Sequence, residues 1–359
     1  MKVAIIGLAN TGKTTVFNAL TGQQVETTLY PTTSGDPHVG TVKVPDSRLD
    51  SLSALFRPKK TTHATIEYVD FIGLTKGDVK QNRKVFDIIK DADAMAHVVR
   101  LFEDDAVAHP LGTIHASRDI DTIEIELIFA DLEFVEKRLE KMEEAVKRGK
   151  KPDESERKLL LKCRDILMKE IPLRNAAFTE EDARAMRPLQ FLSIIPEIVV
   201  LNYGEQSLGS GKEKNLIDEL STQRRSLPIL PLCGKIETEI AQLSPADKKM
   251  FLDDLGLNEP AAHKLIHACF DLLGLISYFT YAGDEVRAWT IKKGSPAQKA
   301  AGKVHSDIER GFIRAEVISF NDLVSAGDIH SARGKGILRL EGKTYEVKDG
   351  DIINFRFNV

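Results

Sequence analysis

The residues whose types and spacing most clearly predict chemistry lie near the start of the chain, at positions 7–14 (GLANTGKT). They match the pattern G-x-x-x-x-G-K-[ST], in which glycines let successive backbone N–H groups point at phosphate oxygens. The Lys13 amine is expected to reach the β- and γ-phosphates of a nucleoside triphosphate, and the Thr14 hydroxyl to ligate Mg²⁺. The predicted nucleotide-binding residues of this loop are Asn10, Thr11, Gly12, Lys13, Thr14 and Thr15.

The segment Asp70-Phe71-Ile72-Gly73 predicts the opposite wall of the same site. Asp70 is expected to hold Mg²⁺ through a water molecule, and the Gly73 N–H to face the γ-phosphate. The next residue is Leu74, where Ras-like enzymes place a glutamine that orients the attacking water. Because leucine cannot hydrogen-bond water, hydrolysis must use another group or a bound cation. Asn10 is a candidate for placing a monovalent cation such as K⁺, and a turn-forming asparagine is an equally good reading.

A later strand predicts how the base is read. Guanine-specific enzymes normally carry Asn-Lys-x-Asp after such a strand, whereas residues 198–201 lead here into Asn202-Tyr203-Gly204-Glu205. Glutamate is one methylene longer than aspartate, which displaces the carboxylate by more than a hydrogen bond tolerates. We therefore expect guanine specificity to be weakened or lost, unless the segment is an ordinary loop that happens to contain Asn and Glu. The predicted residues around the base are Asn202, Tyr203, Glu205, Cys233 and Gly234.

These motifs need a scaffold that brings strand ends and helix starts together. Over residues 1–120 short apolar strands alternate with helical stretches, which predicts an α/β P-loop fold with a mostly parallel sheet. A heptad pattern and a second helix then indicate an inserted α-helical hairpin over 121–189. Strand-like sequence resumes in 190–275, which completes the nucleotide-binding domain. Residues 276–359 are predicted to form a small separate α+β domain.

The composition limits the functional class. The 359 residues carry a formal net charge of −4, which excludes a uniformly basic nucleic-acid binder, and a DNA partner is not expected. No apolar run approaches the ~18 residues of a membrane-spanning helix, so no membrane partner is expected either. The three cysteines lie far apart and show no metal-ligand or redox spacing, which predicts a cytoplasmic protein.

Several separated segments resemble the YchF-type ATPases, a branch of the Obg-related P-loop proteins. They are residues 7–20, 97–104, 202–205, 285–290 (EVRAWT), 311–316 (GFIRAE) and 347–359 (VKDGDIINFRFNV). The resemblance implies a nucleotide domain interrupted by a helical hairpin and followed by a TGS domain, a ubiquitin-like β-grasp module. It also implies a protein that prefers or accepts ATP, hydrolyses it slowly and associates with ribosomes.

Two further site residues follow from the resemblance alone. The family links a loop histidine to hydrolysis, and its match here is His109. The metal-facing threonine of the family's first switch is matched by Ser34 in Pro31-Thr32-Thr33-Ser34. This switch and residues 78–83, which lack the family's glycine-rich stretch, depart from the pattern. Two alternatives stay open: a guanine-preferring GTPase of the translation-factor kind, and a ribosome-binding nucleotide sensor whose hydrolysis is vestigial.

The C-terminal region predicts a nucleic-acid contact. Between Arg287 and Lys348 there are twelve Lys or Arg and seven Asp or Glu residues, a local excess of five positive charges. We expect this basic C-terminal domain to contact ribosomal RNA through phosphates, with an ordinary solvated surface as the alternative. The candidate residues are Lys292, Lys293, Lys299, Lys303, Arg333 and Lys335.

Overall fold

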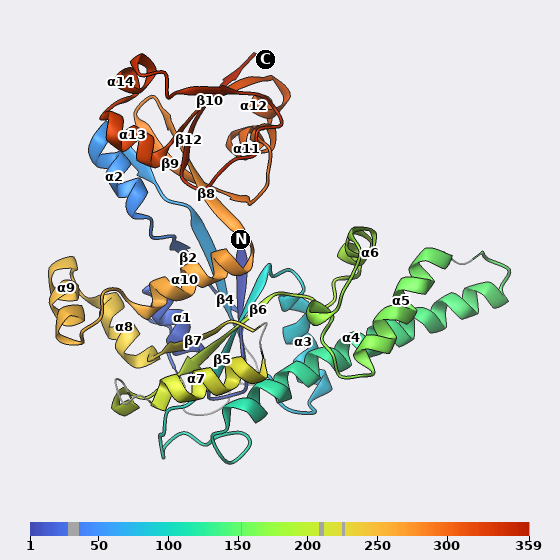
Figure 1. Cartoon of the computed structure of the whole chain (residues 1–359). Helices are drawn as coiled ribbons and strands as arrows, with labels where there is room; N and C mark the ends of the chain where they lie inside the picture. The colour runs from blue at the N-terminus through green and yellow to red at the C-terminus, as the bar shows by residue number, and fades with distance from the viewer. Residues whose placement is uncertain (28–35, 152, 208–211, 225–226, 359) are drawn as a thin grey trace. The chain divides into compact units, whose positions relative to one another are not determined.

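The computed structural model describes residues 1–27, 36–151, 153–207, 212–224 and 227–358, and Figure 1 shows its helices and strands. The chain divides into two compact units. The first comprises Met1–Thr41 and Glu67–Leu265, and the second comprises Val42–Ile66 and Ile266–Val359. Among the described residues, no helix combines the length and the apolar composition that crossing a bilayer requires.

The first unit is built on a six-stranded sheet with the order β2-β4-β1-β5-β6-β7. The pairs β1–β4, β1–β5, β5–β6 and β6–β7 are all parallel, so the predicted mostly parallel α/β sheet is confirmed. The central strands β5 and β6 are buried along their whole length, as expected where helices cover both faces. The strands are β1 (Lys2–Ile6), β2 (His38–Lys43), β4 (Thr65–Asp70), β5 (Ala94–Arg100), β6 (Glu197–Asn202) and β7 (Ile229–Leu232).

Helices follow these strands and cover the sheet (Figure 1). The amphipathic α3 is an example, because it buries Val85, Phe86 and Ile89 in one cluster with the β1 residues Ala4 and Ile6. The helices are α1 (Lys13–Thr21), α3 (Val79–Ile89), α7 (Lys212–Gln223), α8 (Gly234–Gln242), α9 (Pro245–Asp254) and α10 (Ala261–Leu272). α1 and α8 begin just after the ends of β1 and β7, and the carboxyl ends of parallel strands are where ligands of such sheets bind.

The predicted helical hairpin is present. α4 (Ala116–Lys147) and α5 (Glu154–Leu167) run side by side (Figure 1) and share a buried apolar cluster. The return segment contains η1 (Leu173–Asn175), α6 (Glu180–Met186) and η2 (Arg187–Leu189). The buried Asp131 of α4 fixes this return, because its carboxylate accepts hydrogen bonds from the backbone N–H groups of Leu192 and Ser193, both at 2.8 Å.

The second unit contains another six-stranded sheet, with the order β11-β10-β12-β8-β9-β3. β8 and β9 form an antiparallel hairpin, and β12 lies parallel to β8 and antiparallel to β10. With α11 packed on one face, this is the topology of the predicted β-grasp module. Its elements are β8 (Leu275–Ala282), β9 (Glu285–Lys292), α11 (Ala297–Val304), α12 (Ser306–Arg310), β10 (Phe312–Ser319), α13 (Phe320–Ala326), α14 (Ile329–Gly334), β11 (Arg339–Glu341) and β12 (Asp351–Phe357).

The second unit also takes in residues 42–66, which the predicted range 1–120 placed in the nucleotide domain. This segment forms α2 (Ser47–Phe56) and β3 (Lys60–Thr62), and β3 pairs in parallel with β9. The Arg48 guanidinium bonds Asp349 at 2.6 Å, and Phe56 stacks on Tyr281 with ring centroids 4.1 Å apart. These partners lie far along the chain, so no local pattern within 42–66 indicates the grouping.

Candidate nucleotide-binding site

The phosphate loop connects the end of β1 to the start of α1, as its sequence predicts. Asn10 and Gly12 have positive φ angles of 61° and 86°, which curl the backbone between strand and helix. Gly12 is the N-cap of α1, and a Cβ there would lie 2.2 Å from the amide nitrogen of Asn202. Glycine alone combines a left-handed backbone with so close an approach. The loop therefore presents backbone amides and a helix N-terminus to an anion.

The Lys13 side chain is buried, with 7% of its surface exposed. Its amine donates to the Leu8 carbonyl oxygen at 2.7 Å, and the Thr11 hydroxyl donates to the same oxygen at 3.1 Å. Burial lowers the pKa of Lys13 to about 8, while the nearby Asp70 charge acts in the opposite direction. A buried ammonium with so few partners is poorly solvated, and phosphate oxygens would stabilise its charged form.

Thr14 and Asp70 meet at the end of β4. The Thr14 hydroxyl donates to Asp70 Oδ2 at 2.7 Å. Asp70 is 2% exposed, and its Oδ1 has no hydrogen-bond partner among the described residues. Burial raises the pKa of this carboxyl group. A buried carboxylate oxygen without a partner, next to a hydroxyl, is a donor set that fits Mg²⁺.

Thr14 and Asp70 are the two predicted Mg²⁺ ligands that the structure describes. Ser34 lies outside the described residues. His38 stands beside the pair, with its Nδ1 3.8 Å from Asp70 Oδ2, and no sequence motif pointed to it. In the part of the chain that the structure describes, no group of three or more His, Cys, Asp or Glu side chains could hold a metal ion. Mg²⁺ here would take its remaining ligands from phosphates and water, as is usual for this cation.

Gly73 presses against the phosphate loop, because a Cβ at this position would lie 2.5 Å from the Ala9 nitrogen. Leu74 is buried in the core, and its N–H donates to the Gly7 carbonyl at 3.0 Å. Gln81, in the first turn of α3, reaches back to this point. Its Nε2 donates to the Gly73 carbonyl at 3.1 Å, and the side chain lines the nucleotide cavity. Sequence reasoning missed Gln81, since its position depends on how the loop before α3 folds.

Asn202, at the end of β6, ties two loops together. Its Nδ2 donates to the Thr11 carbonyl at 3.0 Å, and its Oδ1 accepts from the Gly234 N–H at 3.0 Å. The side chain is 4% exposed, so it acts as a buried clamp. Tyr203 is also buried and joins the apolar cluster that contains Val99. The predicted base motif therefore lies directly beside the phosphate loop.

Glu205 is engaged by a neighbouring residue, because the Lys235 amine lies 2.6 Å from its Oε1. This contact raises the pKa of Lys235. Phe102 lies at the same end of the site, 3.5 Å from the position that a Cβ on Gly12 would occupy. The Arg100 guanidinium stacks over the Phe102 ring at 4.4 Å. Neither the Lys235 contact nor the place of Phe102 was predicted, since both depend on loops from different strands.

One cavity of about 1390 Å³ joins these parts, all within the first unit. Its predicted lining residues are Asn10, Gly12, Lys13, Thr14, Thr15, Gly73, Asn202, Tyr203, Glu205 and Cys233. Thr11, Asp70 and Gly234 stand one layer back, through the hydrogen bonds given above. A second cleft of about 1480 Å³ runs along α3, α4 and α5 and contains none of the predicted site residues. The chemistry therefore belongs to the smaller cavity.

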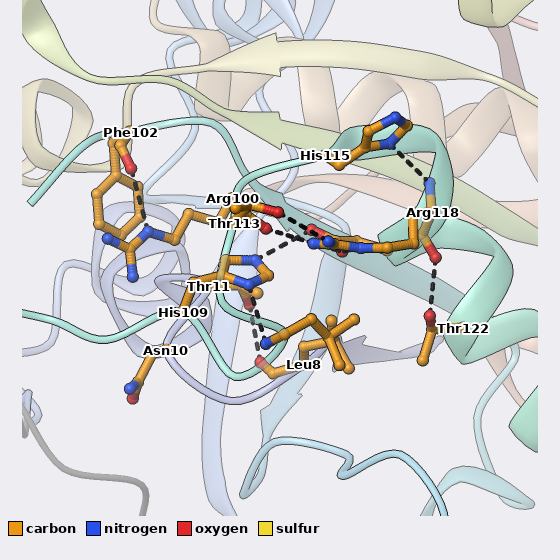
Figure 2. A network of polar contacts seen from close by, with 12 residues as sticks. Leu8, Asn10, Thr11, Arg100, Phe102, His109, Thr113, His115, Arg118 and Thr122 are labelled. Atoms are coloured by element: carbon orange, nitrogen blue, oxygen red, sulfur yellow. Dashed lines mark hydrogen bonds and ion pairs between the residues drawn. The ribbon is translucent and has the colours of Figure 1, made fainter.

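His109 does not line this cavity. Its Nε2 lies 3.1 Å from Asp119 Oδ2, and its Nδ1 accepts the Leu111 N–H at 3.1 Å (Figure 2). Because Nδ1 is an acceptor, Nε2 carries the proton and donates to Asp119. Burial lowers the pKa of His109, which favours this neutral ring. With both ring nitrogens occupied, His109 cannot take a proton from water in this arrangement.

The loop that carries His109 nevertheless contacts the phosphate loop. Asn10 Nδ2 donates to the Ala108 carbonyl at 3.0 Å, one residue before His109. Arg100 shapes the same loop by donating to the carbonyls of Phe102 at 3.1 Å and Val107 at 2.9 Å (Figure 2 shows the first). The Asn10 amide is thus used to join two loops, and its predicted role beside a K⁺ ion stays a prediction.

The fold and the site together define a P-loop nucleotide-binding protein of the GTPase fold, with an inserted helical hairpin and a C-terminal β-grasp unit. A family model described as "50S ribosome-binding GTPase" matches residues 2–152. A second, the YchF-GTPase C-terminal model described as "Protein of unknown function (DUF933)", matches residues 275–358. The chain belongs to the YchF family, as the following relatives show.

Curated relatives match along the full length. The Bacillus subtilis protein named "Ribosome-binding ATPase YchF" is 42% identical over 364 residues, which cover 100% of both chains. The Escherichia coli O157:H7 protein of the same name is 38% identical over 361 residues, which cover 100% of this chain and 99% of the relative. The solved structure of the Schizosaccharomyces pombe YchF GTPase has a TM-score of 0.81 at 28% identity, and covers 99% of this chain and 97% of that one.

Proposed function

We propose that the protein is a Mg²⁺-dependent ATPase that acts as a nucleotide-dependent switch and associates with ribosomes in the cytoplasm. One observation carries the proposal. The buried Lys13 amine and the Thr14 hydroxyl, at the start of α1, lie near Asp70 at the end of β4, and among the described residues one oxygen of its carboxylate has no partner. An ammonium beside a metal-binding pair suits a triphosphate with its cation. The relatives named ribosome-binding ATPases support both ATP and the ribosome.

ATP is proposed as the preferred nucleotide because Glu205 is not free to read guanine. A guanine reader needs a carboxylate that accepts two hydrogen bonds from the base edge. Here the Lys235 amine lies 2.6 Å from Glu205 Oε1 and competes for that acceptor. The apolar ring of Phe102 offers a surface to either purine, so it does not restore a preference for guanine. GTP binding remains the second candidate, favoured by the GTPase fold.

The hydrolytic step is assigned to groups that already face the cavity. Lys13 and the Gly73 N–H would stabilise charge on the transferring phosphoryl group, and Mg²⁺, when bound through Thr14 and Asp70, supplies further positive charge there. His109 must leave Asp119 before it can act. Gln81 already lines the cavity, and its Nε2 is directed at the Gly73 carbonyl. Its Oε1 is therefore available to orient the attacking water.

The decisive experiment measures binding and turnover on the same preparation of nucleotide-free protein. Calorimetric titration with ATP and GTP, with and without Mg²⁺, should show tighter ATP binding that depends on the cation. Phosphate release from labelled ATP should exceed that of a Lys13→Ala control. Turnover no higher than in this control would leave only a nucleotide sensor, and GTP binding more than about tenfold tighter than ATP would favour the GTPase.

A switch also predicts that ribosome association depends on the nucleotide. Co-sedimentation with ribosomes is measured with ATP, with ADP and without nucleotide, at one salt concentration. The proposal expects the bound fraction to differ between ATP and ADP, because the γ-phosphate orders loops that hydrolysis releases. Equal binding in all three states would remove the switch while leaving the ATPase untouched.

A further inference from the structure

One face of the C-terminal sheet carries arginines on neighbouring strands. In the antiparallel pair β10–β12, Arg314 lies opposite Arg356, and Glu316 lies opposite Asn354. Side chains alternate between the two faces of a strand, so these four share one face. The intervening pair, Ala315 and Phe355, points to the other side and belongs to the apolar cluster beneath α11. Arg314, Asn354 and Arg356 are exposed.

A buried carboxylate organises this face. Glu316 is 6% exposed although its side chain lies on the exposed side of the sheet. It accepts hydrogen bonds from Arg356 Nη2 at 2.5 Å, from Arg333 Nη2 at 3.3 Å and from Asn354 Nδ2 at 3.0 Å. The two guanidinium groups remain largely exposed, with 55% and 61% of their side-chain surfaces in solvent. One glutamate thus fixes two arginines that still present donors to a ligand.

The arrangement is unfavourable for stability alone. Like charges directly opposite each other on adjacent strands are destabilising, and Arg314 faces Arg356 in this way. Among the described residues, no carboxylate forms an ion pair with Arg314. We call Arg314, Arg333 and Arg356 the arginine face, and with Glu316 it carries a net charge of +2 from three arginines and one glutamate. A polyanion with closely spaced charges would relieve this repulsion.

The six basic residues predicted from composition do not all lie on this face. Lys299 and Lys303 belong to α11, whose Ala297, Ala300 and Ala301 pack in the cluster on the opposite side of the sheet. Arg333, in contrast, bonds Glu316 on the exposed face. The sheet therefore separates Lys299 and Lys303 from Arg333. Arg314 and Arg356, which were not in the predicted set, lie on the same side as Arg333. Counting charge along the chain could not show this, because strand alternation decides it.

We propose that the arginine face is the surface through which the C-terminal unit binds the phosphate backbone of RNA. Guanidinium groups are planar and match phosphate oxygens with two parallel donors. RNA supplies neighbouring phosphates that can neutralise two facing arginines at once. Farther along this side of the sheet Ile318 and Ile352 are buried, so the exposed part is the end that carries the arginines and Asn354. Leu340 of β11, opposite Glu316, is an exposed apolar neighbour there, and one such side chain beside several charges fits an apolar protein interface poorly. The proposal rests on the proposed ribosome association and names the contact.

The test compares two double variants of the full chain that each remove two positive charges. Arg314→Ala/Arg356→Ala changes the arginine face, and Lys299→Ala/Lys303→Ala is the matched control on α11. The probes are purified ribosomes and protein-free ribosomal RNA, titrated over a range of salt concentrations. Each lost phosphate contact lowers the salt slope of log K by about 0.7–0.9, so the first variant should lose roughly 1.5 and bind at least about tenfold more weakly. The control should bind RNA within about twofold of wild type.

Further measurements separate the possible failures. The variant Arg314→Lys/Arg356→Lys keeps both positive charges and should keep the salt slope of wild type. Thermal melting of every variant shows whether weaker binding reflects a general loss of fold. ATP binding is measured for wild type and every variant, because it reports on the first unit. If wild type does not bind ATP, the proposed ATPase is wrong, but the proposal for the arginine face is unaffected. Equal weakening by both alanine pairs would show diffuse charge attraction and overturn the proposal. Weakened binding to ribosomes with unchanged binding to RNA would assign the face to an acidic protein and would also overturn it.

Discussion

The pKa of Lys13 links nucleotide binding to pH. In the free protein, burial lowers this pKa to about 8, from the value of 10.5 for an exposed lysine. A bound triphosphate places several negative charges beside the Lys13 amine, and these charges raise its pKa again. Tight binding of the triphosphate therefore requires the protonated amine. The terminal phosphate ionises near pH ~6, so it contributes little change above pH ~7.5. ATP affinity should therefore fall as the pH rises through 8.

The magnitude follows from the protonated fraction of the free protein. With a pKa of about 8, the apparent dissociation constant should rise by roughly tenfold between pH 7 and pH 9, or ~1.4 kcal/mol. Binding should take up about 0.1 proton at pH 7 and about 0.9 at pH 9. Calorimetry in two buffers with different heats of ionisation measures both quantities. A flat affinity with uptake below about 0.2 proton at pH 9 would refute the reasoning.

The lowered pKa of Lys13 also makes the unfolding free energy of the nucleotide-free protein depend on pH, in the opposite direction to ATP affinity. Because the folded-state pKa lies below the unfolded one, the unfolded state binds more protons between pH 8 and 10.5, and the unfolding free energy rises with pH there. The buried charge therefore costs stability at neutral pH, by up to ~3 kcal/mol. Lys13→Met should raise the melting temperature of nucleotide-free protein at pH 7 while abolishing ATP binding. A variant that loses both stability and binding would indicate that Lys13 is structural.

Three other predictions concern the walls of the cavity. Gln81→Ala should lower kcat by at least about tenfold with ATP affinity within about twofold, measured by single turnover and calorimetry, whereas the exposed neighbour Lys80→Ala should change neither. Lys235→Ala releases Glu205 and should shift the ratio of GTP to ATP affinity toward GTP by a few-fold. The shift should be ~1 kcal/mol or less, because the Lys235–Glu205 pair is exposed. An unchanged ratio in competition titrations would show that Lys235 does not control Glu205. Asn202→Ala leaves the Thr11 carbonyl and the Gly234 N–H without their buried partner, and should cost about 2–4 kcal/mol in stability or ATP binding, which thermal melts and titration would detect.

Local patterns predicted the parts of the site whose contacts are local. The phosphate loop needs only its own glycines and the helix that follows it, so Lys13 and Thr14 lie where their motif predicts. Asp70 follows from a strand end, and the structure places its carboxylate on the Thr14 hydroxyl at 2.7 Å. The base motif was recognisable for the same reason, because Asn202 ends a buried strand.

Residues that meet through the fold were not predictable in this way. The loop before α3 brings Gln81 to Gly73, and the loops after β6 and β7 bring Lys235 to Glu205. Similarly, the pairing of β3 with β9 decides that residues 42–66 belong to the second unit. Each of these contacts depends on the register and direction of strands that are distant in sequence. The composition of each segment alone carries no information about them.

The environment of His109 decides which residue can orient the attacking water. Release of His109 would remove one partner from the buried Asp119, but Arg118 would still hold Asp119 Oδ1 at 2.7 Å. The release therefore does not leave a buried carboxylate without a cation, and its cost stays near that of one hydrogen bond to a charged group, about 1.5–3 kcal/mol. Binding energy from a triphosphate can supply this, because Asn10 joins the phosphate loop to Ala108, the residue before His109. The kcat of Gln81→Ala consequently distinguishes two states: a large loss means that hydrolysis occurs with His109 held by Asp119, whereas an unchanged kcat means that the loop has moved and His109 has taken over.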